Sequence, residues 1–334
     1  LKDKEASVVS AVREFVEQFN RSGSVTADMS SLVRATDSLP LKKFDYWERL
    51  IRWEYSEALR SAPLSVWSFR KKPKRHLTWI DLSSGNGYER EKTLRALTGA
   101  GAPNSFFFVL AVRRLNDWVP QVREAARDTV PKIAENSNPD QVAGALCTIL
   151  PNWFSWGRLE LTEKQVFFEV LGIEKVTRAL KKQIIESTSG PMATVLSQVG
   201  RTPVLDPHLN DIARSALQPA VRAKAYRSQM EGKMAWFEGR KWEWTDIRYC
   251  KGHYMPIVSE RELSEPLPFL ETLKEAARDK SSIVRRVAGE FLIRNLKSLG
   301  GESIALAKLL ASDSSPAVSE RGEFALKKLH EETA

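Results

Sequence analysis

The feature that most constrains the fold is a short segment in which one helical pattern ends at a tight turn and another begins. An apolar run at residues 106–112 is typical of a helix that ends near Leu115. Asp117 and Pro120 follow, and Pro is tolerated at a first helical position because its missing N–H would have no intrahelical partner there. Small and apolar residues then recur at three- and four-residue spacing, on one helix face: Val122, Ala125, Ala126, Thr129 and Val130. The segment predicts two antiparallel helices joined by an Asp/Pro turn.

This pattern recurs along the chain. An Asp followed five residues later by Val is present at residues 117–122, 279–284 and 313–318. A weaker copy at residues 216–222 keeps the Pro and the Val-Arg pair but has Ala in place of the Asp, and a fainter one lies at residues 88–97. The last two clear copies begin 34 residues apart, which is a usual period for helical repeats.

The pattern resembles the HEAT family of helical-hairpin repeats, whose signature has an Asp in the inter-helix turn and a Val-Arg pair at the start of the second helix. The resemblance covers residues 104–136 and 266–330, and more weakly 203–230. It implies an all-α fold, an α-solenoid of antiparallel helical hairpins, and no particular chemistry. Val318 is followed by Ser319, which departs from the pattern and is expected of a terminal cap. In this family the Asp and Arg positions commonly form a ladder between repeats, a role that the resemblance implies for Asp117, Arg123, Arg222, Asp279, Arg285 and Asp313.

Charge and composition limit the classes of partner. The net charge of +9 would attract nucleic acid, acidic proteins or anionic lipid, and it does not choose among them; mild basicity is also common in soluble proteins. No apolar run has the length that spans a bilayer, and no secretory signal opens the sequence, so we expect no membrane partner. The two cysteines, Cys147 and Cys250, do not make a disulfide framework, and free thiols suit a reducing cytoplasm.

The densest charge run lies at residues 70–76. Pro73 predicts a loop or an extended arm there, because proline disrupts a helix interior. Such an arm would contact phosphates with an affinity independent of sequence, or it would be an ordinary solvated loop. The candidate contact residues are Arg70, Lys71, Lys72, Lys74 and Arg75.

Residues 232–258 break the helical pattern. Glycines interrupt the segment, and Trp242 and Trp244 alternate with a period of two, which predicts an inserted β-hairpin or ordered loop. Aromatic side chains among basic ones stack on bases while the charges hold the nucleic-acid backbone. Alternatively, the aromatics clamp the hairpin onto the helices. The candidate contact residues are Arg240, Lys241, Trp242, Trp244 and Arg248.

No pattern of catalytic or metal-binding residues stands out. The four histidines form no HExxH pair, and Cys250 with His253 has no second pair at metal-site spacing. We therefore predict no metal, no cofactor and no catalytic residue. One enzymatic alternative stays open: certain bacterial DNA glycosylases that excise alkylated bases are built from HEAT-like repeats, with Trp and Asp residues near the lesion. Asp117 beside Trp118 is similar to this, although the repeat pattern also explains that Asp.

The sequence predicts four regions. They are an N-terminal helical region with the basic loop (1–80), HEAT-like repeats (81–231), the aromatic and basic insertion (232–265) and C-terminal HEAT-like repeats (266–334). The function predicted for this arrangement is non-catalytic: a scaffold whose basic extended surface binds nucleic acid or another polyanion. The alternatives are a protein–protein adaptor subunit of a larger bacterial complex, and a HEAT-like glycosylase.

Overall fold

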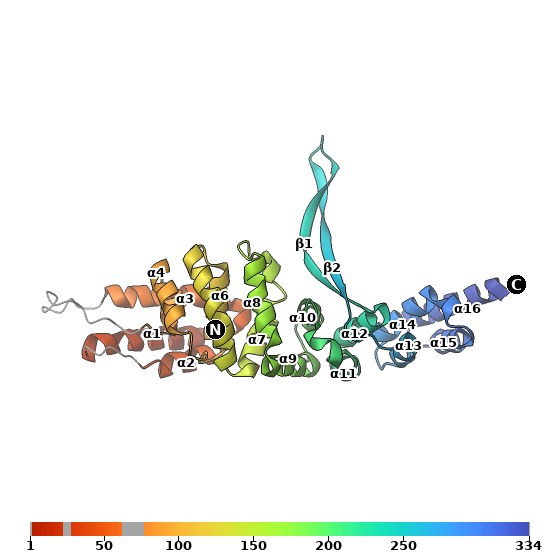
Figure 1. The fold of residues 1–334 in the computed structure, drawn as a ribbon, viewed down its shortest axis with the longest axis horizontal. Coiled ribbons are helices and arrows are strands. Elements are labelled where there is room, and N and C mark those ends of the chain that lie inside the picture. Colours follow the sequence, from red (N-terminus) through yellow and green to blue (C-terminus); the bar gives the residue numbers. More distant parts are fainter. Residues whose placement is uncertain (1, 23–27, 62–76, 334) are drawn as a thin grey trace. The chain divides into compact units, whose positions relative to one another are not determined.

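The fold is mainly helical, with one small antiparallel sheet (Figure 1). The computed structural model describes residues 2–22, 28–61 and 77–333. The prediction of a helical chain with an inserted β-hairpin is confirmed. The basic run at residues 70–76 lies outside the described residues. Among the described helices, none is long and apolar enough to span a bilayer.

The chain divides into two compact units, Leu1–Val176 and Thr177–Ala334. The four regions that the sequence predicts stay a prediction. The described part of the first unit contains four short 3-10 helices, at Leu41–Lys43, Trp79–Ser83, Arg114–Asn116 and Trp153–Ser155. Its α-helices are α1 (Lys2–Ser22), α2 (Ser30–Asp37), α3 (Phe44–Arg60), α4 (Gly87–Ala96), α5 (Ser105–Arg113), α6 (Pro120–Asn136), α7 (Pro139–Ile149) and α8 (Leu161–Gly172).

The helix pair expected around Asp117 is formed by α5 and α6. The Asn104 side chain caps α5 by accepting the N–H of Phe107, and every residue from Phe106 to Val112 is buried, so α5 is an interior helix. Pro120 begins α6. Helix α6 contacts α4 on one side and α8 on the other, while α5 contacts α7. The second helices of successive pairs therefore form one layer, α4–α6–α8.

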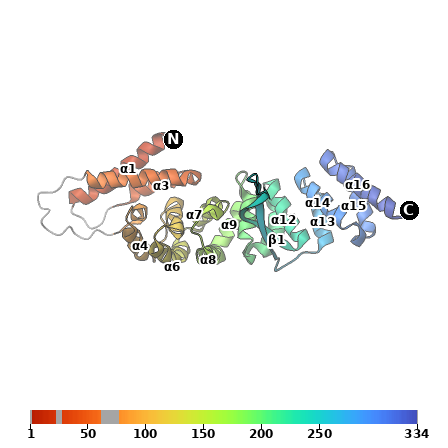
Figure 2. The same cartoon turned by 90° about the horizontal axis from the view of Figure 1, so that it is seen from above.

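The second unit repeats this arrangement. Helices α10, α12, α14 and α16 contact one another in sequence, and α11, α13 and α15 pack against them (Figures 1 and 2). Short 3-10 helices occur at Pro203–His208 and Leu296–Ser298, and α9 (Glu174–Glu186) contains the boundary between the units. The remaining helices are α10 (Met192–Val199), α11 (Leu209–Ser215), α12 (Pro219–Glu231), α13 (Phe269–Ala277), α14 (Ser282–Arg294), α15 (Gly301–Ala311) and α16 (Pro316–Thr333).

A long β-hairpin is inserted between α12 and α13. Gly232 ends α12 in the left-handed conformation (φ 66°), which glycine adopts without a Cβ clash. Strands β1 (Lys233–Asp246) and β2 (Lys251–Glu262) then pair antiparallel, and the hairpin stands away from the helices of its unit (Figure 1). Strand β2 ends four residues beyond residue 258, within the predicted insertion of residues 232–265.

Candidate nucleic-acid interface

The distal half of the hairpin, residues 239–258, has two unlike faces. Its register is regular from the pair Gly239–Ile257 to the pair Trp244–Gly252, so side chains alternate between the faces along each strand. One face carries the aromatic rings, and no acidic side chain belongs to it. We call it the aromatic face; it consists of Arg240, Trp242, Trp244, Gly252, Tyr254 and Pro256.

The three rings of the aromatic face hold one another in place. The Trp242 ring lies edge-to-face against Trp244, with centroids 5.5 Å apart, and against Tyr254 at 5.0 Å. Gly252 permits this, because a Cβ there would lie 2.6 Å from the Trp242 ring. Despite these contacts, Trp242 is 41% exposed, Trp244 52% and Tyr254 63%. The rings are thus ordered by each other and still open to a ligand.

The opposite face and the turn carry both polar and apolar side chains. Lys241, Glu243, His253 and Met255 alternate with the aromatic face. At the turn, the Asp246 carboxylate accepts the backbone N–H groups of Arg248 and Tyr249. The five predicted contact residues on the hairpin are therefore not equivalent. The structure places Arg240, Trp242 and Trp244 on the aromatic face, Lys241 on the opposite face and Arg248 in the turn.

The cations of the distal hairpin outnumber its acids. Residues 239–258 contain four Lys or Arg and two acidic residues, Glu243 and Asp246. Within the described ranges, no ion pair engages the side chains of Arg240, Lys241, Arg248 or Lys251. The Lys251 ammonium lies 5.8 Å from the centre of the Tyr249 ring. These charges are available to a polyanion, which would release counterions on binding.

The base of the hairpin is fixed to its helical unit. The Lys224 ammonium donates to the Ala235 carbonyl at 2.6 Å, and Met234 is buried. Arg201 donates to both oxygens of Glu238 at 2.9 Å, and Glu238 also accepts the indole N–H of Trp236. Trp236 is therefore held at the base of the hairpin by Glu238 and by Arg201, whose guanidinium carbon lies 5.5 Å from the ring centre.

A second anchor joins β2 to the Pro203–His208 segment. Arg261 donates two hydrogen bonds to Asp206, at 2.6 and 2.8 Å, and further bonds to the carbonyls of Gly200 and Thr202. Burial raises the pKa of Asp206, but hydrogen bonds from Arg261 and Ser264 outweigh it and leave the pKa below its usual value. The aromatic face is thus carried on a strand pair with a rigid base.

Away from the hairpin, three ion pairs join a second helix to the turn of the next helix pair. Each guanidinium donates two N–H groups to the two oxygens of one carboxylate, over 2.5 to 2.9 Å, the strong bidentate geometry. The pairs are Arg90–Asp117, Arg222–Asp279 and Arg285–Asp313.

The same local geometry surrounds all three pairs. The remaining terminal nitrogen of each arginine donates to the carbonyl six residues earlier in its own turn, at Ser84, Ala216 and Asp279. Each carboxylate also accepts the backbone N–H two residues further on, at Val119, Ser281 and Ser315. We call this combination the turn ion pair. Its recurrence makes α4, α12 and α14 equivalent in their surroundings.

Two residues of this set differ from the sequence prediction. Arg90 takes part in a turn ion pair although the faint repeat copy around it, at residues 88–97, lacks both the Asp and the Val of the pattern. The sequence feature that could have indicated this role is an Arg six residues after the turn residue Ser84. Arg123, in contrast, donates to the Asp117 carbonyl, and within the described ranges it has no carboxylate partner. Arg127 instead joins α6 to α8 through Glu163.

Asp117 is enclosed by this arrangement. It is 5% exposed, and its oxygens accept from Arg90, Arg114 and the Val119 N–H. Burial raises its pKa, but the hydrogen bonds from Arg90 and Val119 and the Arg114 charge outweigh burial and leave the pKa lowered. Trp118 is 66% exposed, and its ring centre lies 5.9 Å from the Arg90 guanidinium carbon. Asp117 is therefore buried and paired beside an exposed Trp118, so its carboxylate does not open onto a site that the two residues share.

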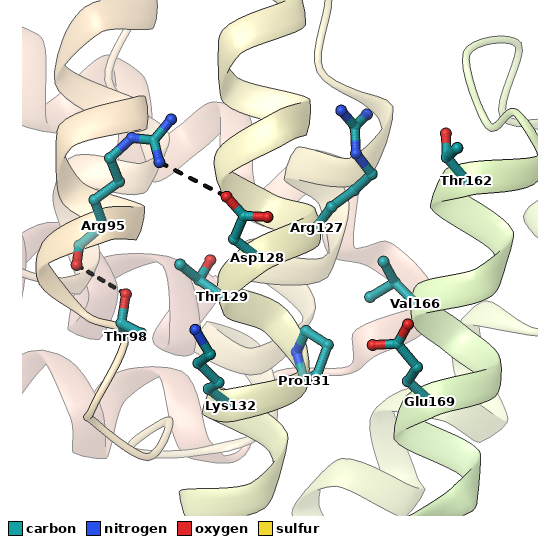
Figure 3. A pocket seen from close by; sticks show the side chains of 10 residues that line it. All are labelled: Arg95, Thr98, Arg127, Asp128, Thr129, Pro131, Lys132, Thr162, Val166 and Glu169. Atoms are coloured by element: carbon teal, nitrogen blue, oxygen red, sulfur yellow. Dashed lines mark hydrogen bonds and ion pairs between the residues drawn. The ribbon is translucent and has the colours of Figure 1, made fainter.

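A groove in the first unit is a second place to consider. It has a volume of about 690 Å³ and lies between α4, α6 and α8 (Figure 3). Both arginines of the groove have acidic partners: Arg95 lies 3.1 Å from Glu91 and 3.8 Å from Asp128, and Arg127 pairs with Glu163. Lys132 is the one basic lining residue without an ion pair among the described residues. This local neutralisation makes the groove a weaker site for a polyanion than the hairpin.

The described residues were also considered as metal ligands and as reactive thiols. It contains no cluster of three His, Cys, Asp or Glu residues that would hold a metal. Burial raises the pKa of Cys147 to about 12, so this thiol stays protonated. Cys250 is exposed in the hairpin turn.

Comparison with known proteins does not place the chain in a family. No protein-family model matches it, and no curated protein shows significant sequence similarity to it.

Proposed function

We propose that this protein is a non-catalytic scaffold of HEAT-like helical repeats that binds nucleic acid through the distal half of its hairpin. The observation that carries the proposal is the aromatic face. Three exposed rings lie beside cations that no acidic residue of the described chain neutralises. Aromatic rings and unpaired cations together are the combination that proteins use to hold bases and phosphates.

The recurring turn ion pair supports the repeat part of this proposal. Helix pairs at separate places in the sequence bind the turn of the next pair through the same three sets of hydrogen bonds. The arginines that make these bonds are Arg90, Arg222 and Arg285. Such identity of local geometry is expected when successive helical hairpins are copies of one unit, each packing on its neighbour. The scaffold would then serve to carry the hairpin.

The proposal is tested by fluorescence anisotropy with labelled single-stranded DNA, duplex DNA and RNA, each over a salt titration. We expect binding that weakens steeply with salt. Replacing Arg240, Arg248 and Lys251 by Ala should reduce the magnitude of the log–log salt slope by about two to three, since each phosphate contact contributes close to one.

A matched control removes three positive charges from helices away from the hairpin. Lys308, Lys327 and Lys328 are exposed on α15 and α16, and their replacement by Ala should leave the slope nearly unchanged. An equal effect of both triple variants would assign binding to the basic surface in general. Absence of binding at low salt would reject a nucleic-acid partner.

An adaptor function is favoured by one further observation. Ile247 and Tyr249, among the most exposed large hydrophobic residues, lie together at the hairpin turn. Exposed apolar groups rimmed by charge are typical of protein-binding surfaces. This alternative expects an acidic protein partner that binds wild type and is lost on Ile247→Ser with Tyr249→Ser, and little affinity for nucleic acid.

A further inference from the structure

We infer that the nucleic acid held on the aromatic face is single-stranded, with unpaired bases stacked on Trp242, Trp244 and Tyr254. This inference rests on the proposed function and adds the class of ligand to it. It follows from the openness of the rings, from their spacing along the strand and from the position of the charges.

The openness of the rings requires a partner with free base faces. In an edge-to-face contact the edge of one ring covers part of a neighbour, and about half or more of Trp244 and Tyr254 stays accessible. Bases inside a duplex are already stacked on both faces, so only their edges and the sugar-phosphate backbone are accessible to the aromatic side chains of a protein. Unpaired bases can be splayed out and stacked on aromatic side chains.

The spacing of the side chains indicates an extended strand. Arg240, Trp242 and Trp244 lie on one face at every second residue, which separates neighbouring Cα atoms by about 6.6–6.8 Å, and the Trp242 and Trp244 ring centres lie 5.5 Å apart. Both separations exceed the roughly 3.4 Å rise per nucleotide within a strand of B-form DNA. A chain that follows these side chains therefore has to be pulled out of its stacked helical form, and a single strand permits this at little cost.

The charges are arranged for a backbone that passes the rings. Arg240 precedes the tryptophans along β1, and Arg248 and Lys251 lie beyond them at the turn. Cations therefore stand at both ends of the aromatic row. Of the two acidic side chains, Glu243 lies on the opposite face, and Asp246 ends β1 with its carboxylate bound to the backbone N–H groups of Arg248 and Tyr249. Bases on the rings with phosphates at the two ends satisfy both sets of groups.

The inference is tested by comparing three ligands of equal phosphate number: oligothymidylate, the same chain with abasic sites throughout, and a duplex. We expect the full-length protein to bind oligothymidylate about 10-fold more tightly than the abasic chain. Base–aromatic stacking contributes about 1–3 kcal/mol per base, and 1.4 kcal/mol corresponds to tenfold in affinity. The duplex should also bind more weakly than oligothymidylate.

Two variants separate stacking from charge. Trp242→Ala with Trp244→Ala should lower affinity for oligothymidylate about 10-fold while leaving its salt slope unchanged. Trp242→Phe with Trp244→Phe keeps a stacking surface and should retain most of the affinity. Trp53→Ala removes a tryptophan of α3 that is more exposed than either of these and serves as the control. Far-UV circular dichroism checks that each variant is folded.

The outcomes separate the claim that the hairpin binds nucleic acid from the claim that the ligand is single-stranded. Equal affinity for the abasic and base-containing chains, or a preference for the duplex, would overturn the inference and leave nucleic-acid binding intact. Binding to no nucleic acid would overturn both claims. Association with phosphatidylserine-containing vesicles in that case would assign the aromatic face to a lipid surface, where Trp and Tyr are also favoured.

Discussion

At the scale of one residue, Arg222 shows how a charged side chain can be part of the core. Its guanidinium is buried, donates two hydrogen bonds to Asp279 and donates further to the turn carbonyls of Ala216 and Leu217. A buried charge is tolerated when it is paired and its hydrogen bonds are made, and removal of one partner leaves the other buried and unpaired.

Arg222→Ala is therefore expected to lower the free energy of unfolding by about 3–5 kcal/mol. Arg214→Ala is the matched control, because Arg214 also forms a two-bond pair with Glu275 but is exposed, and its loss should cost less than about 1 kcal/mol. Urea denaturation measures both values. Equal losses in the two variants would contradict the structural role of the turn ion pair.

Asp313 gives the turn ion pair a pH dependence. The hydrogen bond from Arg285 lowers its pKa most, and the Ser315 N–H and the Arg285 charge add to this against the opposing effect of burial. A carboxyl with a lowered folded-state pKa adds stability above its unfolded value of 3.8, and that stability is lost as the pH falls through the folded value.

Asp313→Asn should thus be less stable than wild type at pH 7, and the difference should shrink as the pH falls below 3.8. Urea denaturation across this range measures it. A difference that stays constant down to the acid transition of the protein would show that ionisation of Asp313 contributes nothing.

The sequence identified most of these residues but not their pairing. Arg222, Asp279, Arg285 and Asp313 stand in recognisable copies, whereas Arg90 stands in a copy without the Asp. The distinction between Arg90 and Arg123 depends on which acidic residue the neighbouring turn supplies, and that is a tertiary property. Sequence spacing alone does not contain it.

At the scale of the element, the hairpin combines a fixed base with an open distal half. Loss of helical periodicity and the Trp alternation predicted it. The predicted insertion reached residue 265, but strand pairing as far as Glu262 could not be predicted, since residues 259–262 show no apolar alternation and Arg261 is held by Asp206 from another segment. Likewise, Tyr254 joins the aromatic face only through the cross-strand register, which depends on where the turn lies.

Gly252→Ala tests the packing of the rings. The added Cβ would lie 2.6 Å from the Trp242 ring and 2.6 Å from the Glu243 carbonyl oxygen, so the ring has to move. We expect a changed near-UV circular dichroism signal from the coupled tryptophans and weaker binding of oligothymidylate. Gly99→Ala, whose Cβ meets no atom within 4 Å, is the control. An unchanged spectrum would contradict the described ring positions.

At the scale of the whole molecule, the two units contain the same kind of helix pairing, and the hairpin belongs to the second. The boundary at Val176 falls inside the amphipathic pattern of α9, so no break in composition marks it in the sequence. The helices form most of the buried core, whereas the hairpin carries exposed aromatic rings and cations unpaired within the described chain, which a partner would bind. Function in this proposal therefore depends on the distal half of the hairpin, which stands away from the helices of its unit (Figure 1).

The most direct measurement compares wild type with a chain in which residues 240–256 are replaced by Asn-Gly, a two-residue turn that suits a hairpin. This change keeps the anchors at Asp206 and Glu238, so the far-UV circular dichroism of the helices should persist. Salt titrations with oligothymidylate should show most of the affinity lost and the salt slope flattened in the shortened chain. Unchanged affinity and slope would place the binding surface elsewhere and contradict the proposal.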